Sequence, residues 1–175
     1  MTPTATPMTT VAKPSTGQDL LALVVSLVLV LVVGTIAAGA NAGNVAGWYH
    51  ALAKPAWTPP DSWFPVVWTV LYVLMGVAAW LVWRDFEVPG RAGALALYLV
   101  QLALNALWSF VFFDWHLIGW GLFEIAVLWL FVLATTFAFW QINRLAGVLL
   151  LPYLVWTTYA AALNLAIWLQ NPPGA

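Results

Sequence analysis

Polar side chains and aromatic rings recur at helical spacing inside three long apolar stretches of this sequence. In one stretch Gln101, Asn105 and Trp108 follow at intervals of four and three residues, which puts them on one face of a helix. Amide groups are unfavourable in hydrocarbon, so their presence there marks a candidate functional site. Such a face offers ring stacking and a few hydrogen bonds, which is typical of ligand binding.

Two other stretches carry faces of the same kind. Their members are Trp68 and Tyr72 in one stretch, and Tyr153, Trp156, Ala160 and Asn164 in the other. If the three faces converge, they form a pocket with aromatic walls and few hydrogen-bond donors, which suits a large, flat, mostly apolar ligand. The alternative is that Asn and Gln only bridge neighbouring helices, each contributing about 0.6–2 kcal/mol.

Signatures of enzymes are scarce. His50 and His116 are the only histidines, they lie in no metal-binding motif, and the chain has no cysteine. The sequence therefore predicts neither a metal site nor a required cofactor. Glu124 is the only carboxylate inside an apolar stretch. It indicates a proton or ligand site, or else a residue near the membrane interface or a carboxyl group that keeps its proton.

A short linker between the first two apolar stretches, residues 41–63, is rich in aromatic residues and proline. It contains Trp48, Tyr49, Trp57 and the prolines at positions 55, 59 and 60. Proline fixes φ and removes a backbone donor, so the linker cannot be a regular helix throughout. We expect a stiff aromatic cap over the space between the helices, with Trp48 and Trp57 as further candidate ligand contacts.

The composition places the chain in a lipid bilayer. Hydrophobic residues make up 64% of it and charged residues 6%, whereas soluble domains carry about a quarter charged residues. There is no basic surface for nucleic acid. We predict an all-α integral membrane protein, a five-transmembrane-helix bundle, with spans near residues 20–40, 64–83, 92–113, 117–140 and 145–169. The membrane domain covers residues 19–170, residues 1–18 are expected to be disordered, and residues 171–175 form a tail.

The first span and the charged loops leave two questions of topology. Lys13, the apolar run and the small residues near Ala40 resemble a cleavable signal peptide, but the span continues too far, so a retained helix is favoured. If the helices alternate, Lys13, Arg84, Arg91 and Arg144 lie on one side of the membrane and Lys54 on the other. The positive-inside rule then predicts a cytoplasmic N-terminus.

Several longer motifs carry a family resemblance. They are Trp48-Tyr49-x-x-Leu52-x-Lys54-Pro55-x-Trp57-x-Pro59-Pro60, Pro65-Val66-Val67-Trp68-Thr69-x-Leu71-Tyr72, Gln101-Leu102-x-Leu104-Asn105-x-Leu107-Trp108 and Pro152-Tyr153-Leu154-Val155-Trp156-x-x-Tyr159-Ala160-x-x-Leu163-Asn164. In this order they resemble the TspO/MBR family, also called tryptophan-rich sensory proteins, translocator proteins or peripheral benzodiazepine receptors. The resemblance covers roughly residues 20 to 170.

The resemblance implies a homodimeric membrane receptor that binds porphyrins, such as protoporphyrin IX or a haem-like tetrapyrrole, together with sterols and benzodiazepine-site ligands. By position, Trp68, Asn105, Trp156 and Ala160 match pocket residues of that family. Bacterial relatives are reported to degrade protoporphyrin in light, with the tryptophans that match Trp68 and Trp156 implicated. The proposed sterol motif near the carboxyl end lacks its basic residue here, because none follows Tyr159.

Three functions are therefore compared. The first is a sensory or transport protein that binds tetrapyrroles in an intramembrane aromatic pocket. The second is a light-dependent porphyrin-degrading enzyme in which Trp68 or Trp156 donates an electron to the excited ligand. The third is a passive scaffold whose aromatic residues only pack. The first is favoured.

Overall fold

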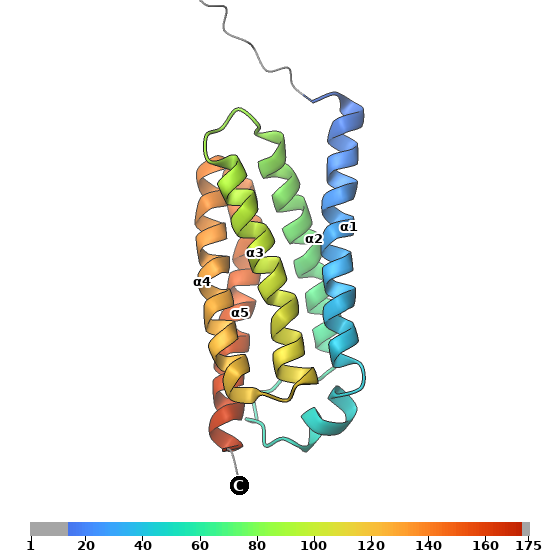
Figure 1. Ribbon diagram of the computed structural model, residues 1–175, viewed down its shortest axis with the longest axis vertical. Helices are drawn as coiled ribbons and strands as arrows, with labels where there is room; N and C mark the ends of the chain where they lie inside the picture. The colour runs from blue at the N-terminus through green and yellow to red at the C-terminus, as the bar shows by residue number, and fades with distance from the viewer. Residues whose placement is uncertain (1–13, 173–175) are drawn as a thin grey trace, which may run out of the picture.

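Five long helices form the protein in the computed structural model, which describes residues 14–172 (Figure 1). They are α1 (Thr16–Asn41), α2 (Trp63–Arg84), α3 (Arg91–Ser109), α4 (Ile118–Ile142) and α5 (Arg144–Gln170), and no strand occurs in residues 14–172. All five helices, α3 together with its extension to Asp114, are long and apolar enough to cross a membrane. The predicted all-α bundle of five membrane-spanning helices is confirmed, and the chain is a multi-pass integral membrane protein.

The start of α1 differs from the expectation of disorder through residue 18. Ser15 Oγ accepts a hydrogen bond from the Gln18 amide, and the Gln18 side chain accepts one from the Ser15 amide. This capping box satisfies backbone donors at the helix end and starts the helix at Thr16. The disorder predicted for residues 16–18 is therefore wrong. Residues 1–13 and 173–175 lie outside the described residues.

Neighbouring helices pack in a closed ring. α1 packs against α2 and α3, α2 against α5, α3 against α4, and α4 against α5, so the order around the bundle is α1, α2, α5, α4, α3. α1 is thus one of the five helices of this ring, and its retention stays a prediction. Arg84, Arg91 and Arg144 lie at one end of the bundle, and the linker between α1 and α2 crosses the other end (Figure 1).

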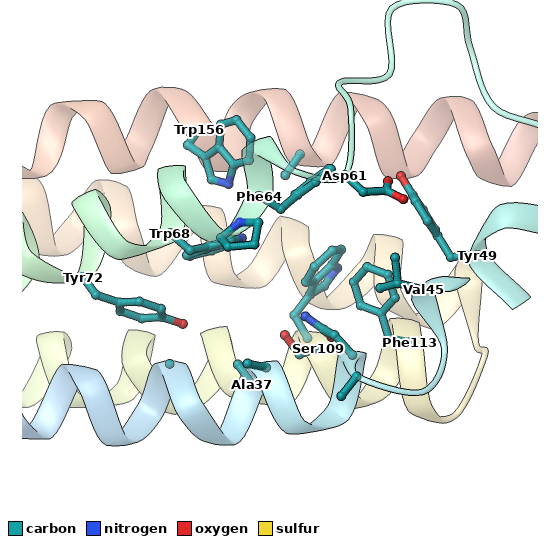
Figure 2. A pocket seen from close by; sticks show the side chains of 17 residues that line it. Ala37, Val45, Tyr49, Asp61, Phe64, Trp68, Tyr72, Ser109, Phe113 and Trp156 are labelled. Atoms are coloured by element: carbon teal, nitrogen blue, oxygen red, sulfur yellow. The ribbon is translucent and has the colours of Figure 1, made fainter. Parts of the chain in front are cut away.

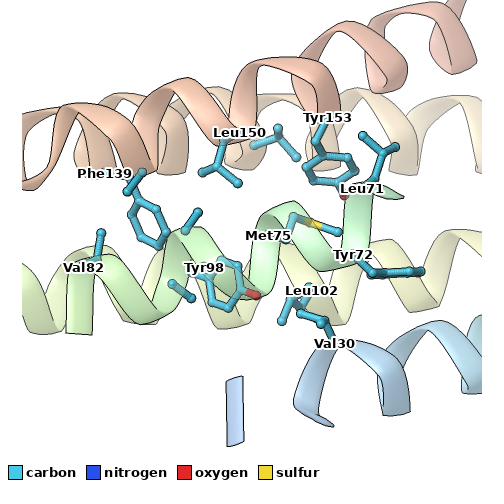
Figure 3. Packing of buried hydrophobic residues seen from close by; sticks show 14 of the residues in the cluster. Val30, Leu71, Tyr72, Met75, Val82, Tyr98, Leu102, Phe139, Leu150 and Tyr153 are labelled. Carbon is cyan, nitrogen blue, oxygen red and sulfur yellow. The ribbon is translucent and has the colours of Figure 1, made fainter. Parts of the chain in front are cut away.

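Side chains from all five helices meet in the interior. Val30, Met75, Leu102, Leu128 and Leu150 are each at most 2% exposed, and most of them are visible in Figure 3. Lipid is as apolar as these side chains, so close packing rather than water exclusion holds the helices together.

Two five-residue π-helical segments interrupt the regular pattern near the covered end. η1 (Val45–Tyr49) lies in the linker, and η2 (Phe110–Asp114) extends α3. Phe112 and Phe113 of η2 pack against Tyr49 of η1, with ring centroids 6.3 and 5.5 Å apart. This aromatic contact holds the linker against the end of the bundle.

Candidate functional site: an intramembrane cavity

A cavity of about 330 Å³ lies at the end of the bundle beneath the linker (Figure 2). Its walls come from α1, α2, the end of α3, α5 and the linker. No residue of α4 lines it in the described part of the chain. The volume falls near the lower end of the roughly 300–1,000 Å³ typical of small-molecule pockets.

Aromatic rings of α2 and α5 form one wall. The centroids of Trp68 and Trp156 are 6.5 Å apart with their planes at 86°, and Phe64 lies 5.9 Å from Trp156 in a similar edge-to-face contact. Trp68 also stacks on Tyr72 at 5.4 Å. Ala160 lines the same wall and leaves space beside the indoles. A flat apolar ligand could stack on these rings.

Small residues of α1 form the opposite wall, which the sequence analysis missed. Gly34, Ala37, Ala38 and Asn41 all line the cavity. Their spacing of three, one and three residues is itself a one-face helical pattern, so the signal was present in the sequence. Gly34 is required by packing, because a Cβ atom there would lie 2.7 Å from Tyr72 Cε2.

The predicted site residue Asn105 lies behind the cavity wall rather than in it. Its Oδ1 accepts a hydrogen bond of 2.6 Å from the Tyr72 hydroxyl, and its Nδ2 donates one of 3.1 Å to the Tyr153 hydroxyl. The ring of Tyr153 in turn contacts Trp68 at 6.2 Å. Asn105 and Tyr153 therefore orient the cavity-lining rings, and the Asn105 amide is not free to bind a ligand.

Asn164 has a comparable supporting position on α5. Its Oδ1 accepts a hydrogen bond of 3.3 Å from Trp108 Nε1, and its Nδ2 donates to the Ile118 carbonyl. Trp108 lines the main cavity, whereas Asn164 lines a smaller space of about 30 Å³ that shares several wall residues with it. By contrast, no acceptor is found for the indole N–H of Trp68 or Trp156 among residues 14–172, so both can donate to a ligand.

The linker is fastened to the bundle by specific hydrogen bonds. The Asn171 side chain accepts from the Ala53 amide and donates to the Ala53 carbonyl, at 3.0 and 2.9 Å. The Tyr159 hydroxyl donates to the Trp57 carbonyl at 3.0 Å. Lys54 Nζ donates to three carbonyls within the linker, those of Tyr49, His50 and Leu52. The linker thus has the geometry of a lid over the cavity.

Trp48 and Trp57, both predicted ligand contacts, do not line the cavity. Trp48 stacks on His116 with centroids 4.3 Å apart, and Trp57 packs edge-on against Tyr159 at 5.6 Å. His116 is further fixed by a contact of 3.1 Å between its Nε2 and Asn44 Oδ1. These two indoles therefore hold the lid by packing against neighbouring aromatic rings.

Gln101 and Glu124 lie in the bundle interior and do not line the cavity. They are 1% and 7% exposed, and their side-chain polar atoms have no hydrogen-bond partner among the described residues. Of the predicted residues, the structure brings together Trp68, Tyr72, Trp108, Trp156 and Ala160 at the cavity. Ser109 and Phe113 join them there and were not predicted.

Two polar residues of the lid also reach the cavity, and sequence reasoning missed both. Tyr49 is buried, and this burial, with a smaller effect of the nearby Asp61 carboxylate, raises the pKa of its hydroxyl to about 12. Tyr49 is therefore a neutral group at physiological pH. Asp61 Oδ2 lies 2.7 Å from His50 Nε2. Among residues 14–172 no group of three or more His, Cys, Asp or Glu side chains could hold a metal ion.

These features define a multi-pass membrane protein with an aromatic internal pocket under a fastened lid. The sequence matches the TspO/MBR family over residues 25–169, and the chain belongs to that family. The resemblance inferred from the motifs is thereby confirmed.

Several relatives align over most of the chain. The protein CrtK of Rhodobacter capsulatus is 39% identical over 150 residues, covering 84% of this chain and 94% of that protein. A tryptophan-rich sensory protein of Cereibacter sphaeroides is 48% identical over 117 residues, which is 67% of this chain and 72% of the relative. The translocator protein of Homo sapiens is 38% identical over 131 residues, covering 74% and 78% of the two chains.

Proposed function

We propose that this protein is a membrane receptor that binds tetrapyrroles of the protoporphyrin IX type in the cavity beneath the lid. The observation that carries the proposal is the convergence of Trp68, Trp108 and Trp156 from three helices on one cavity. Stacking on indole faces favours a flat conjugated ring. The names of the relatives, sensory and translocator protein, support a receptor or transport role.

The cavity volume indicates how such a ligand would enter. A tetrapyrrole is larger than a cavity of about 330 Å³, so only its apolar edge would lie among the indoles and its propionates would stay at the lid. The free N–H groups of Trp68 and Trp156 supply the few hydrogen-bond donors that orient it.

Fluorescence quenching tests this proposal directly. Protoporphyrin IX added to the purified protein in detergent should quench tryptophan emission with a Kd of about micromolar (~8 kcal/mol). Ala160→Leu places a larger side chain in the cavity and should weaken binding at least about tenfold. The matched control is Ala126→Leu on α4, which is exposed and does not line the cavity. Equal affinity of all three proteins would place the ligand elsewhere.

A second candidate function is light-dependent degradation of the bound porphyrin, in which dissolved molecular oxygen is the oxidant. The edge-to-face contact of Trp68 and Trp156 at the cavity wall favours it, because either indole would lie against the excited ring and could donate an electron, which the reduced ring then passes to oxygen. Illumination should then remove the porphyrin absorbance over repeated turnovers, and Trp68→Phe should abolish that loss. Equal bleaching by heat-unfolded protein would contradict an enzymatic role.

A further inference from the structure

The cavity carries a negative charge at its polar end. Among the described residues that line it, Asp61 is the only one with a charged side chain. Its side chain is 37% exposed, so it lies at the boundary between the cavity and the solvent. The polar end of a ligand held at this end of the cavity would lie near this carboxylate.

One side chain pairs with Asp61. His50 Nε2 lies 2.7 Å from its carboxylate. When His50 is protonated, the two groups together are neutral. When it is not, the full charge of Asp61 faces the ligand.

No other charged group near the lid forms an ion pair with Asp61 among the described residues. Lys54 is occupied by three linker carbonyls and lies over the Tyr49 ring at 4.7 Å. His116 is held by Asn44 and Trp48, and the Tyr159 hydroxyl donates to a carbonyl. Three arginines, at positions 84, 91 and 144, lie at the opposite end of the bundle (Figure 1). Asp114 at the end of η2 is exposed and adds no positive charge.

We propose that Asp61, paired with His50, is a specificity-determining residue that disfavours ligands with carboxylate ends and favours those whose polar end is neutral or cationic. The proposal rests on the proposed function, because it assumes that the cavity is the ligand site. It implies that a dianionic porphyrin binds with less than the affinity that its ring alone would provide.

Two porphyrins with the same ring system but different charge separate the effect of charge on affinity from the effect of stacking. Protoporphyrin IX carries two propionates, and its dimethyl ester carries none. At about pH 8, Asp61→Asn should tighten binding of protoporphyrin IX about three- to tenfold, because removing a nearby charge lowers the repulsion by that order. The same substitution should leave the Kd of the dimethyl ester within about twofold. Asp114→Asn removes a carboxylate at the same end of the bundle and should change neither Kd.

A second test needs no change at Asp61. His50→Arg places a permanent positive charge beside Asp61, whereas His50→Gln places none. His50→Arg should therefore bind protoporphyrin IX about three- to tenfold more tightly than His50→Gln, and the two variants should bind the ester equally. His116→Arg and His116→Gln, at a histidine that is not paired with Asp61, should differ by less than about twofold.

The results distinguish this inference from the proposed function. If Asp61→Asn leaves the ratio of the two Kd values unchanged, or if His50→Arg and His50→Gln give the same ratio, the specificity role of Asp61 is wrong although the cavity still binds porphyrin. If neither porphyrin binds the wild-type protein, the proposed function itself fails. Should Asp61→Asn not fold, judged by circular dichroism and gel filtration, the comparison of His50→Arg with His50→Gln decides the question.

Discussion

Gly34 and Tyr72 lie against each other on the two walls of the cavity. The Tyr72 ring lies so near the α1 backbone that no side chain fits between them, and its hydroxyl is held from the other side by Asn105. The ring is therefore fixed by one steric and one polar contact. Gly39, five residues further along α1, has no neighbouring atom within 4 Å of an added Cβ.

This difference predicts opposite effects of the same substitution at two glycines of one helix. Gly34→Ala should destabilise the protein by about 1–3 kcal/mol, because the Tyr72 ring must move away from Asn105. Gly39→Ala should be neutral or stabilising by up to about 1 kcal/mol, since alanine favours helix. Thermal unfolding in detergent, followed by circular dichroism, measures both. Equal stability of the two variants would mean that the ring shifts freely.

At the residue scale, the sequence predicted the aromatic residues of the cavity wall better than the residues that hydrogen-bond to them. Trp68, Tyr72, Trp108 and Trp156 could be predicted because large rings at helical spacing are conspicuous. Asn105 was placed on the correct helix face, but its two tyrosine partners come from other helices and no spacing rule pairs them. Asp61 lies in an irregular linker, where no periodicity indicates which side chains point inward.

At the element scale, the linker is fastened over the cavity at a few specific points. The Asn171 side chain, just after α5, makes two of these bonds with Ala53. The expected stiff aromatic cap agrees with this arrangement, because the prolines limit the backbone and Lys54 ties the linker to itself. The fastening to residue 171 was not predictable, since that position was assigned to a tail.

Removing this fastening should open the lid more often. We expect Asn171→Ala to speed hydrogen exchange at the Ala53 amide by about tenfold or more, because the amide loses its acceptor and the segment loses its anchor. Gln170→Ala, at the exposed neighbouring position, is the control and should leave the rate unchanged. Exchange read by mass spectrometry on linker peptides gives the rates. Identical protection in both variants would show that the linker is held chiefly by its aromatic contacts.

At the scale of the whole molecule, the five spans followed from length and hydropathy, whereas the order of the helices around the ring did not. Hydropathy reports only that a segment crosses the membrane. The order α1, α2, α5, α4, α3 depends on which side chains fit together. For example, Gly76 of α2 leaves room for the side chain of Leu27 of α1. Only this order shows that the small residues of α1 line the cavity.

The orientation of the bundle is the remaining property that charge predicts. Arg84, Arg91 and Arg144 gather at one end and Lys54 lies at the other, so the positive-inside rule puts the lid on the side away from the cytoplasm. Because the chain has no cysteine, a single introduced thiol reports its own position. Ala51→Cys in the lid should react with a membrane-impermeant maleimide on intact cells, and Glu87→Cys in the loop after α2 should react only after lysis. The reverse pattern would invert the topology, so the cavity would open to the cytoplasm and receive its ligand from there.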